Sequence, residues 1–166
     1  LGLFILVFFC LQIALYLVNE IKLPKMNLRK LTGKSGKVRV LALDPHPDDE
    51  TMLSGGFITH FSRSKDVQIK HICVTKGEKG DELLKLNEKE LAIVREGEYK
   101  NAITTLGCMN FEIWDFHDGK VEQESKVIKQ KLDVEINKFK PDVILTYERA
   151  GLYGHPDHVA LTEIIH

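Results

Sequence analysis

The stretch KVRVLALDPHPDDE at residues 37–50 decides the fold class. Its first half, residues 37–43, is rich in β-branched and aliphatic residues and predicts a buried strand that ends where prolines and carboxylates begin. Similar strand patterns recur three times, and a segment with helical spacing of apolar residues follows each strand. We expect strands at 37–43, 67–74, 111–114 and 141–147, and helices at 50–64, 88–106, 123–139 and 158–166.

The alternation of strands and helices predicts an α/β fold. We expect a Rossmann-like, mainly parallel sheet in strand order 3-2-1-4, with helices on both faces. In that order the first and fourth strands are neighbours. The segments that follow these two strands should therefore meet at one end of the sheet.

Two polar clusters follow the first and fourth strands. HPDDE at 46–50 comes directly after the first strand, and HPDH at 155–158 lies in a short loop after the fourth. Open α/β sheets bind their ligands at the carboxyl ends of their strands, where the strand order reverses. The topology therefore predicts that the two clusters face each other.

The residue types in these clusters suit a hydrolytic zinc site. Catalytic zinc takes three protein ligands and keeps a fourth position for water. His46 and Asp49, three residues apart at the start of a helix, can bind one metal, and His158 can supply the third ligand. Asp48 could accept a proton from the bound water, whose pKa falls to about 7, and His155 could stabilise the oxyanion.

Each cluster alone has an ordinary structural explanation. Two aspartates at a helix start are usually a cap, and an isolated pair of histidines is often a surface feature. The two clusters together favour a metal site, although a His/Asp/His set also accepts divalent ions other than zinc. Glu50 would either orient a metal ligand from behind or merely favour the helix N-terminus.

A hydrophobic segment precedes this domain. Residues 1–18 carry no charge, and at about 1.5 Å per residue they would form a helix roughly 27 Å long, close to the thickness of a bilayer core. We expect a transmembrane anchor at 1–21, a basic linker at 22–36 and a catalytic domain at 37–166 that looks truncated at its C-terminus. The alternatives are a buried core helix, which should show a polar face, and a cleaved signal, which should end in a small-x-small site.

Charge gives further constraints. Seven basic residues and no acidic ones lie at 22–40, and by the positive-inside rule they predict a catalytic domain on the cytoplasmic side. The membrane would be the endoplasmic reticulum in a eukaryote and the cell membrane in a prokaryote. A formal net charge of -1 gives no reason to expect nucleic-acid binding, and three cysteines are too few for a disulfide scaffold.

The motifs PHPDDE at 45–50 and GHPDH at 154–158 resemble the LmbE/PIG-L family of zinc-dependent N-acetylglucosamine de-N-acetylases. Three further motifs are similar to that family: a Thr-x-Gly loop at 75–80, an Arg/Glu helix at 95–107 and an Asp-Gly loop at 118–119. The resemblance covers residues 38–166. The Pro-Asp pair inside the second motif looks more like the bacterial and archaeal branch.

The resemblance implies a role for each matching residue. Tyr153 matches a tyrosine that helps to bind the tetrahedral intermediate in some members, unless it is only a surface aromatic. Arg95 would contact the substrate or brace the loop, unless it merely forms a buried pair with Glu98 or an aspartate. The other implied roles are those of zinc ligands for His46, Asp49 and His158, general base for Asp48, and acid or oxyanion stabiliser for His155.

The resemblance and the hydrophobic segment together predict a reaction. We expect removal of the N-acetyl group from an N-acetylglucosaminyl conjugate, namely a glycolipid such as the N-acetylglucosaminyl-phosphatidylinositol of glycosylphosphatidylinositol anchor synthesis. One alternative is a soluble conjugate, either a thiol glycoside or a chitooligosaccharide. An alternative of another class is a non-catalytic, membrane-anchored sugar-binding module with a structural metal, although structural sites usually have four protein ligands.

Overall fold

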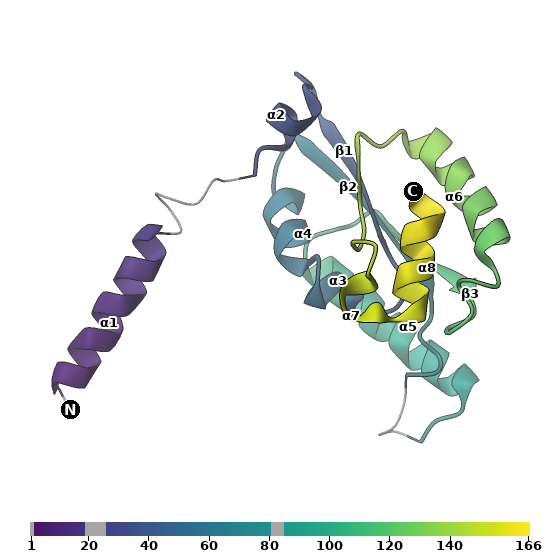
Figure 1. The fold of residues 1–166 in the computed structure, drawn as a ribbon, viewed down its shortest axis with the longest axis horizontal. Coiled ribbons are helices and arrows are strands. Elements are labelled where there is room, and N and C mark those ends of the chain that lie inside the picture. The colour runs from purple at the N-terminus through teal and green to yellow at the C-terminus, as the bar shows by residue number, and fades with distance from the viewer. Residues whose placement is uncertain (1, 19–25, 81–84) are drawn as a thin grey trace.

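The computed structural model describes residues 2–18, 26–80 and 85–166 (Figure 1). In this part of the chain a parallel sheet forms the centre of the domain, in the order β3-β2-β1-β4. The predicted α/β class and strand order are therefore confirmed. The strands are β1 (Val38–Asp44), β2 (Val67–Thr75), β3 (Phe111–Phe116) and β4 (Val143–Leu145).

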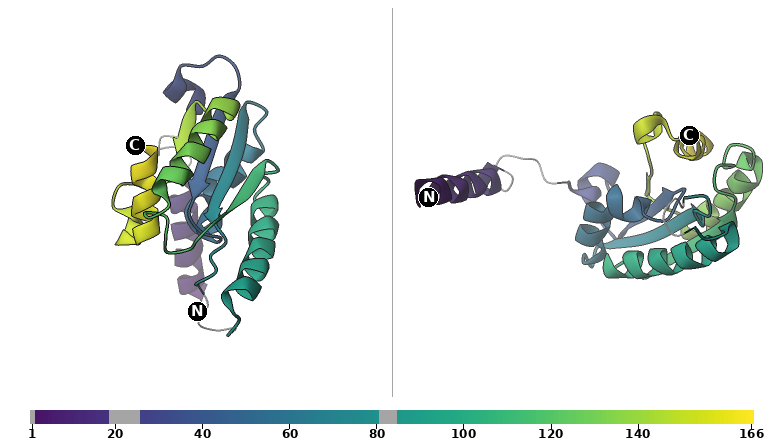
Figure 2. Two further views of the ribbon diagram at one scale, coloured as in Figure 1. Left: turned by 90° about the vertical axis from the view of Figure 1, so that its right-hand side faces the viewer. Right: turned by 90° about the horizontal axis from the view of Figure 1, so that it is seen from below.

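Helices cover both faces of the sheet (Figure 2). On one face, α4 (Gly55–Ser62) and α5 (Glu88–Thr105) pack on alternate residues of β1 such as Val38 and Val40. On the other face, α6 (Ser125–Phe139) and α8 (Pro156–Ile165) pack on the β1 residues that point the opposite way, such as Leu41 and Leu43. Because successive side chains of a strand point to opposite faces, β1 contributes to two apolar layers.

A capping motif in the sequence fixes the start of α5. Asn87 caps α5: its side chain accepts hydrogen bonds from the backbone of Lys89 and Glu90, and the Glu90 carboxylate accepts one from the backbone of Asn87. A short helix, α2 (Leu28–Thr32), lies in the predicted linker and buries Leu28 against the domain. The predicted linker is thus partly helical.

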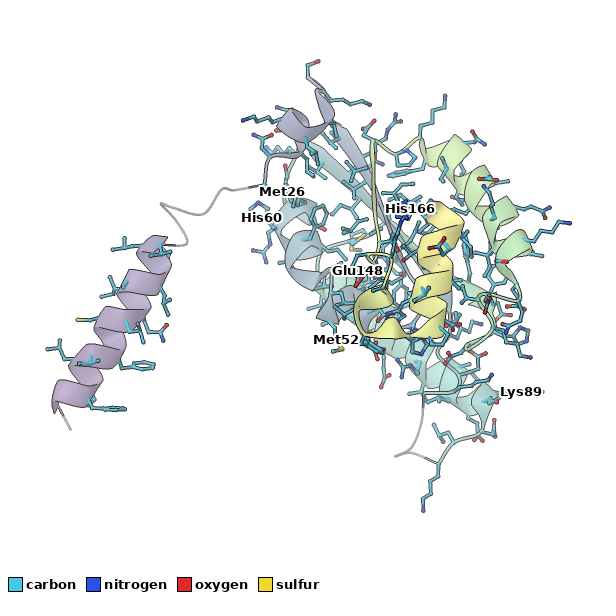
Figure 3. All side chains as sticks on the ribbon, viewed as in Figure 1. Met26, Met52, His60, Lys89, Glu148 and His166 are labelled. Carbon is cyan, nitrogen blue, oxygen red and sulfur yellow. The ribbon has the colours of Figure 1, made fainter. Side chains whose placement is uncertain are left out.

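The helix predicted at 50–64 is two helices, α3 (Asp49–Met52) and α4. The break falls at Leu53 and Ser54, directly before a pair of glycines, which are poor helix formers. Met52, at the end of α3, is 79% exposed (Figure 3). The break lets α3 act as a single turn that presents HPDDE side chains at the end of β1.

The apolar N-terminal segment forms α1 (Gly2–Leu17), a helix of 16 residues. At about 1.5 Å per residue it is roughly 24 Å long, shorter than the roughly 30 Å core of a bilayer. Among all the residues described, no helix combines the length and the apolar character needed to cross a membrane. The predicted transmembrane helix and the membrane localisation drawn from it are therefore wrong.

Candidate active site

The two polar clusters meet at the carboxyl ends of β1 and β4. Ala42 of β1 pairs with Leu145 of β4, so the loops that follow these strands begin side by side. The ring centroids of His46 and His158 are 5.4 Å apart, and those of His46 and His155 are 4.8 Å apart. A hollow of about 230 Å³ opens beside the rings of His46 and His155. The predicted juxtaposition of the two clusters is thus present.

Asp49 lies between two of the histidines. Its Oδ2 atom is 3.5 Å from His46 Nδ1 and 3.5 Å from His158 Nε2. In a tetrahedral zinc site with bonds of about 2.0–2.1 Å, neighbouring ligand atoms are roughly 3.4 Å apart. These two separations match those of neighbouring ligand atoms on one divalent ion.

The His158 ring supplies a second test of that fit. Both its nitrogens are buried, and neither has a hydrogen-bond partner with good geometry among the described residues. Burial lowers the pKa of His158 and outweighs the attraction of the Asp49 carboxylate, so the ring is neutral. A buried, neutral imidazole with an unsatisfied nitrogen is what a metal ligand requires.

His155 is within reach of the same position. Ligand nitrogens of His46, His155 and His158 lie within 4.8 Å of one another. However, His155 Nδ1 accepts a hydrogen bond from the backbone N–H of Asp157 at 3.2 Å and so caps α8. This bond leaves Nε2 of His155 as the nitrogen available for chemistry.

The far side of the His46 ring meets two carboxylates. His46 Nε2 is 3.1 Å from Asp157 Oδ2 and 3.2 Å from Asp118 Oδ1. Burial lowers the pKa of His46, but the nearby carboxylates of Asp118, Asp157 and Asp49 prevail and raise it to about 11. The sequence motifs contain Asp118 and Asp157, yet nothing in the sequence assigns either of them to His46.

Asp48 has a strained backbone that its neighbours hold. Its φ is +92°, a left-handed conformation that is uncommon for residues other than glycine. The Glu50 Oε2 atom accepts a hydrogen bond from the backbone N–H of Asp48 at 2.9 Å, and the hydroxyl of Thr51 donates to Glu50 Oε1 at 2.8 Å. Glu50, which is 1% exposed, therefore fixes Asp48.

Arg95 contacts the same segment from α5. Its Nη2 atom donates to Asp48 Oδ2 at 2.8 Å and to the carbonyl of Pro47. The glycine loop after β2 makes room for this guanidinium. A Cβ on Gly77, whose φ is +65°, would lie 2.7 Å from Arg95 Nε. Arg95 thus braces the loop and also pairs with an aspartate, Asp48, whereas its contact with a substrate stays a prediction.

Tyr153 lies in the loop before α8. Gly151 has a φ of +61°, and a Cβ there would lie 2.9 Å from the Cβ of His158, so only glycine fits this turn. Glu148 accepts a hydrogen bond from the backbone N–H of Leu152 at 2.7 Å and holds the loop (Figure 3). Tyr153 lines the hollow, with its ring 5.3 Å from that of His158, and is 70% exposed.

Tyr147 is a site residue that the sequence analysis missed. Its ring stacks on that of His158, with centroids 4.1 Å apart and planes 22° apart. Burial raises the pKa of Asp49, but His46 and the nearby Tyr147 hydroxyl outweigh it and lower that pKa. Tyr147 was predicted to end a strand, and no motif in the sequence marks it as part of a site.

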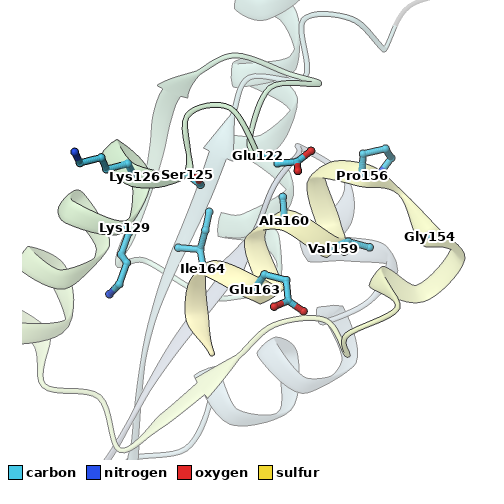
Figure 4. Close-up of a pocket in the computed structure, with 10 residues that line it drawn as sticks. All are labelled: Glu122, Ser125, Lys126, Lys129, Gly154, Pro156, Val159, Ala160, Glu163 and Ile164. Carbon is cyan, nitrogen blue, oxygen red and sulfur yellow. The ribbon is translucent and has the colours of Figure 1, made fainter.

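A larger hollow of about 630 Å³ lies between α6 and α8 (Figure 4). Its floor is formed by Ala160 and Ile164 of α8, and Lys126 and Lys129 of α6 lie on one side. It contains none of the three histidines. We place the chemistry in the smaller hollow, where the histidines and carboxylates converge.

Comparisons with known proteins found a family model and several relatives that match this chain. The family model described as PIG-L, GlcNAc-PI de-N-acetylase, matches residues 41–166. A probable N-acetyl-alpha-D-glucosaminyl L-malate deacetylase 2 of Bacillus cereus is 32% identical over 126 residues, which cover 73% of this chain and 56% of that protein. A 1D-myo-inositol 2-acetamido-2-deoxy-alpha-D-glucopyranoside deacetylase of Mycolicibacterium gilvum is 30% identical over 149 residues, covering 73% of this chain and 50% of that protein.

A solved structure is also similar. The N,N'-diacetylchitobiose deacetylase of Pyrococcus horikoshii superposes with a TM-score of 0.72 at 26% sequence identity, covering 93% of this chain and 56% of that one. The chain therefore spans about half the length of the relatives that it matches.

Proposed function

The chain belongs to the GlcNAc-PI de-N-acetylase (PIG-L) family, and from that premise we propose that it is a zinc-dependent deacetylase of a soluble N-acetylglucosaminyl conjugate. The observation that carries this proposal is the position of Asp49 Oδ2, 3.5 Å from one nitrogen of His46 and from one of His158. The names of the relatives support the soluble conjugate, because they refer to inositol, malate and chitobiose derivatives. The glycolipid expectation rested on the predicted membrane span, which is wrong.

We assign the metal to His46, Asp49 and His158. When bound, a zinc ion supplies a water of lowered pKa and polarises the acetamide carbonyl. Asp49 is charged and the pKa of His158 is lowered by burial, so this set brings one negative and at least one neutral ligand to the ion. Tyr147, stacked on His158, keeps that ring in place.

Asp48 is assigned as the general base. It lines the hollow beside Asp49, and its side chain is more than half exposed, so a water can reach it. The left-handed backbone sets the direction of this side chain, and the Glu50 and Arg95 contacts hold it in place. A carboxylate held in this way takes the proton that the attacking water loses.

His155 is assigned as the acid. Because its Nδ1 accepts the Asp157 backbone hydrogen bond, a hydrogen on the ring of neutral His155 resides on Nε2. That N–H can donate to the developing oxyanion and then to the leaving amine. Tyr153, at the mouth of the hollow and partly over His155, is assigned to binding the same intermediate.

The substrate class is tested by the release of free amine. Zinc-loaded full chain is incubated with four acetylated conjugates: GlcNAc-inositol, GlcNAc-malate, N,N'-diacetylchitobiose and N-acetylglucosaminyl-phosphatidylinositol. We expect amine from at least one of the first three at a higher rate than from the lipid. Release from the lipid alone would contradict the soluble substrate, and release from none of the four would contradict the proposed reaction.

A further inference from the structure

Asp157, the third residue of the HPDH motif, has no role in the chemistry proposed above. Its side chain is almost entirely buried, with 1% of the residue exposed. Oδ2 accepts a hydrogen bond from the backbone N–H of Gly119 at 2.7 Å, and Oδ1 accepts one from that of Val121 at 3.2 Å. The same Oδ2 lies 3.1 Å from His46 Nε2 in hydrogen-bond geometry. Asp157 thus joins α8, the loop after β3 and the loop after β1.

The direction of the bond to His46 follows from the chemistry of a carboxylate. An ionised carboxylate can only accept hydrogen bonds, so the hydrogen lies on His46 Nε2. The opposite nitrogen, Nδ1, faces Asp49 Oδ2, and it would give up its hydrogen on metal binding and offer its lone pair to the ion. The contact therefore selects the ring orientation that a ligand at this position needs.

The neighbouring Asp118 is less suited to this task. Its Oδ1 atom is 3.2 Å from His46 Nε2 but does not meet hydrogen-bond geometry, and its Oδ2 accepts the backbone N–H of Lys79. It also lines the hollow, whereas Asp157 does not. Asp118 is therefore free to face a bound molecule, while Asp157 is enclosed by protein on all sides.

We propose that Asp157 is a positioning residue: it holds the His46 ring with Nδ1 directed at the metal position and ties that ring to the loop after β3. The inference rests on the metal site of the proposed function, and it concerns affinity for the ion rather than turnover. Carboxylates that hold a ligand histidine in this way typically affect metal affinity by about 10–100-fold.

The test compares two aspartate-to-asparagine variants. In Asp157→Asn one oxygen becomes an amide NH₂ group, so the side chain cannot accept from His46, Gly119 and Val121 together. The matched control is Asp142→Asn, because Asp142 also accepts a backbone N–H, from Arg39 at 2.8 Å, but directly precedes β4, at the end of that strand opposite the site. Zinc affinity is measured by competition with a chromophoric chelator, on full chain with native circular dichroism.

We expect zinc to bind Asp157→Asn about 10–100-fold more weakly than the wild type, and Asp142→Asn within twofold of it. Wild-type zinc affinity in folded Asp157→Asn would overturn the inference. The assay contains no substrate, so it separates the two proposals: tight zinc binding without deacetylation would refute the proposed function and leave the role of Asp157 standing.

A second measurement needs no substitution and applies even if Asp157→Asn does not fold. Long-range ¹H–¹⁵N correlation spectra of the zinc-loaded wild type report which nitrogen of each histidine ring carries hydrogen. We expect a hydrogen on Nε2 of His46 that exchanges slowly with solvent, and none on Nδ1. A hydrogen on Nδ1, or an unprotonated Nε2, would overturn the inference.

Discussion

Replacement of Gly77 by alanine tests how the site is braced. Gly77 has a φ of +65°, and a left-handed conformation costs a residue with a Cβ about 1–2 kcal/mol. The new Cβ would lie 2.7 Å from Arg95 Nε, so the guanidinium must move and weaken its hydrogen bond to the Pro47 carbonyl, which is worth about 1 kcal/mol. We expect Gly77→Ala to lose about 2–3 kcal/mol of unfolding free energy.

The assay is thermal unfolding followed by the fluorescence of Trp114, which is buried and is the one tryptophan of the sequence. For a domain of this size the expected loss lowers Tm by about 4–12 °C. Deacetylase activity should fall as well, because the displaced Arg95 no longer holds Asp48. Gly97→Ala is the control: it lies within α5 with open space around its Cβ, and should stabilise the protein by about 0.5–1 kcal/mol. A Gly77→Ala protein as stable and active as the wild type would refute the bracing role.

Three other predictions concern single side chains. Asp49→Ala should abolish tight zinc binding, measured by chelator competition, because the remaining set has lost its only charged ligand. Glu50→Leu should lower kcat at least about tenfold, whereas Glu50→Gln, which still accepts from Asp48, should retain most activity. Burial raises the pKa of Glu112, but Lys70 outweighs it and lowers that pKa from 4.5. This stabilisation is present above pH 4.5 and is lost as the pH falls further. Because Glu112 is more than a third exposed, urea unfolding should show a stability gap of about 1 kcal/mol between wild type and Lys70→Met at pH 7, and the gap should narrow toward pH 3.

Local patterns were sufficient for the order of the sheet and for the meeting of the two clusters. The periodicity of apolar residues distinguishes strands from helices, and the rules of α/β topology then bring the ends of β1 and β4 together. The break between α3 and α4 was not predicted, because the Leu53–Ser54 break lies within an otherwise helical pattern.

The contacts that orient the site are not visible in local patterns. Asp157 and His46 are 111 residues apart in the sequence, and no spacing rule links them. Tyr147 continues a strand pattern and gives no sign that it stacks on His158. The prediction for the N-terminal segment failed for a different reason. Composition gives the apolar character of the segment, but the length of α1 depends on where its helical hydrogen bonds end.

The most direct test of the account is acetate release by the zinc-loaded chain, measured beside the Asp48→Asn variant on the same acetylated conjugate. Asp48 is assigned to proton transfer and not to the metal, so the variant should keep its zinc and lose about 10²–10⁴-fold in kcat. Acetate released at the wild-type rate by zinc-loaded Asp48→Asn would contradict the proposed mechanism.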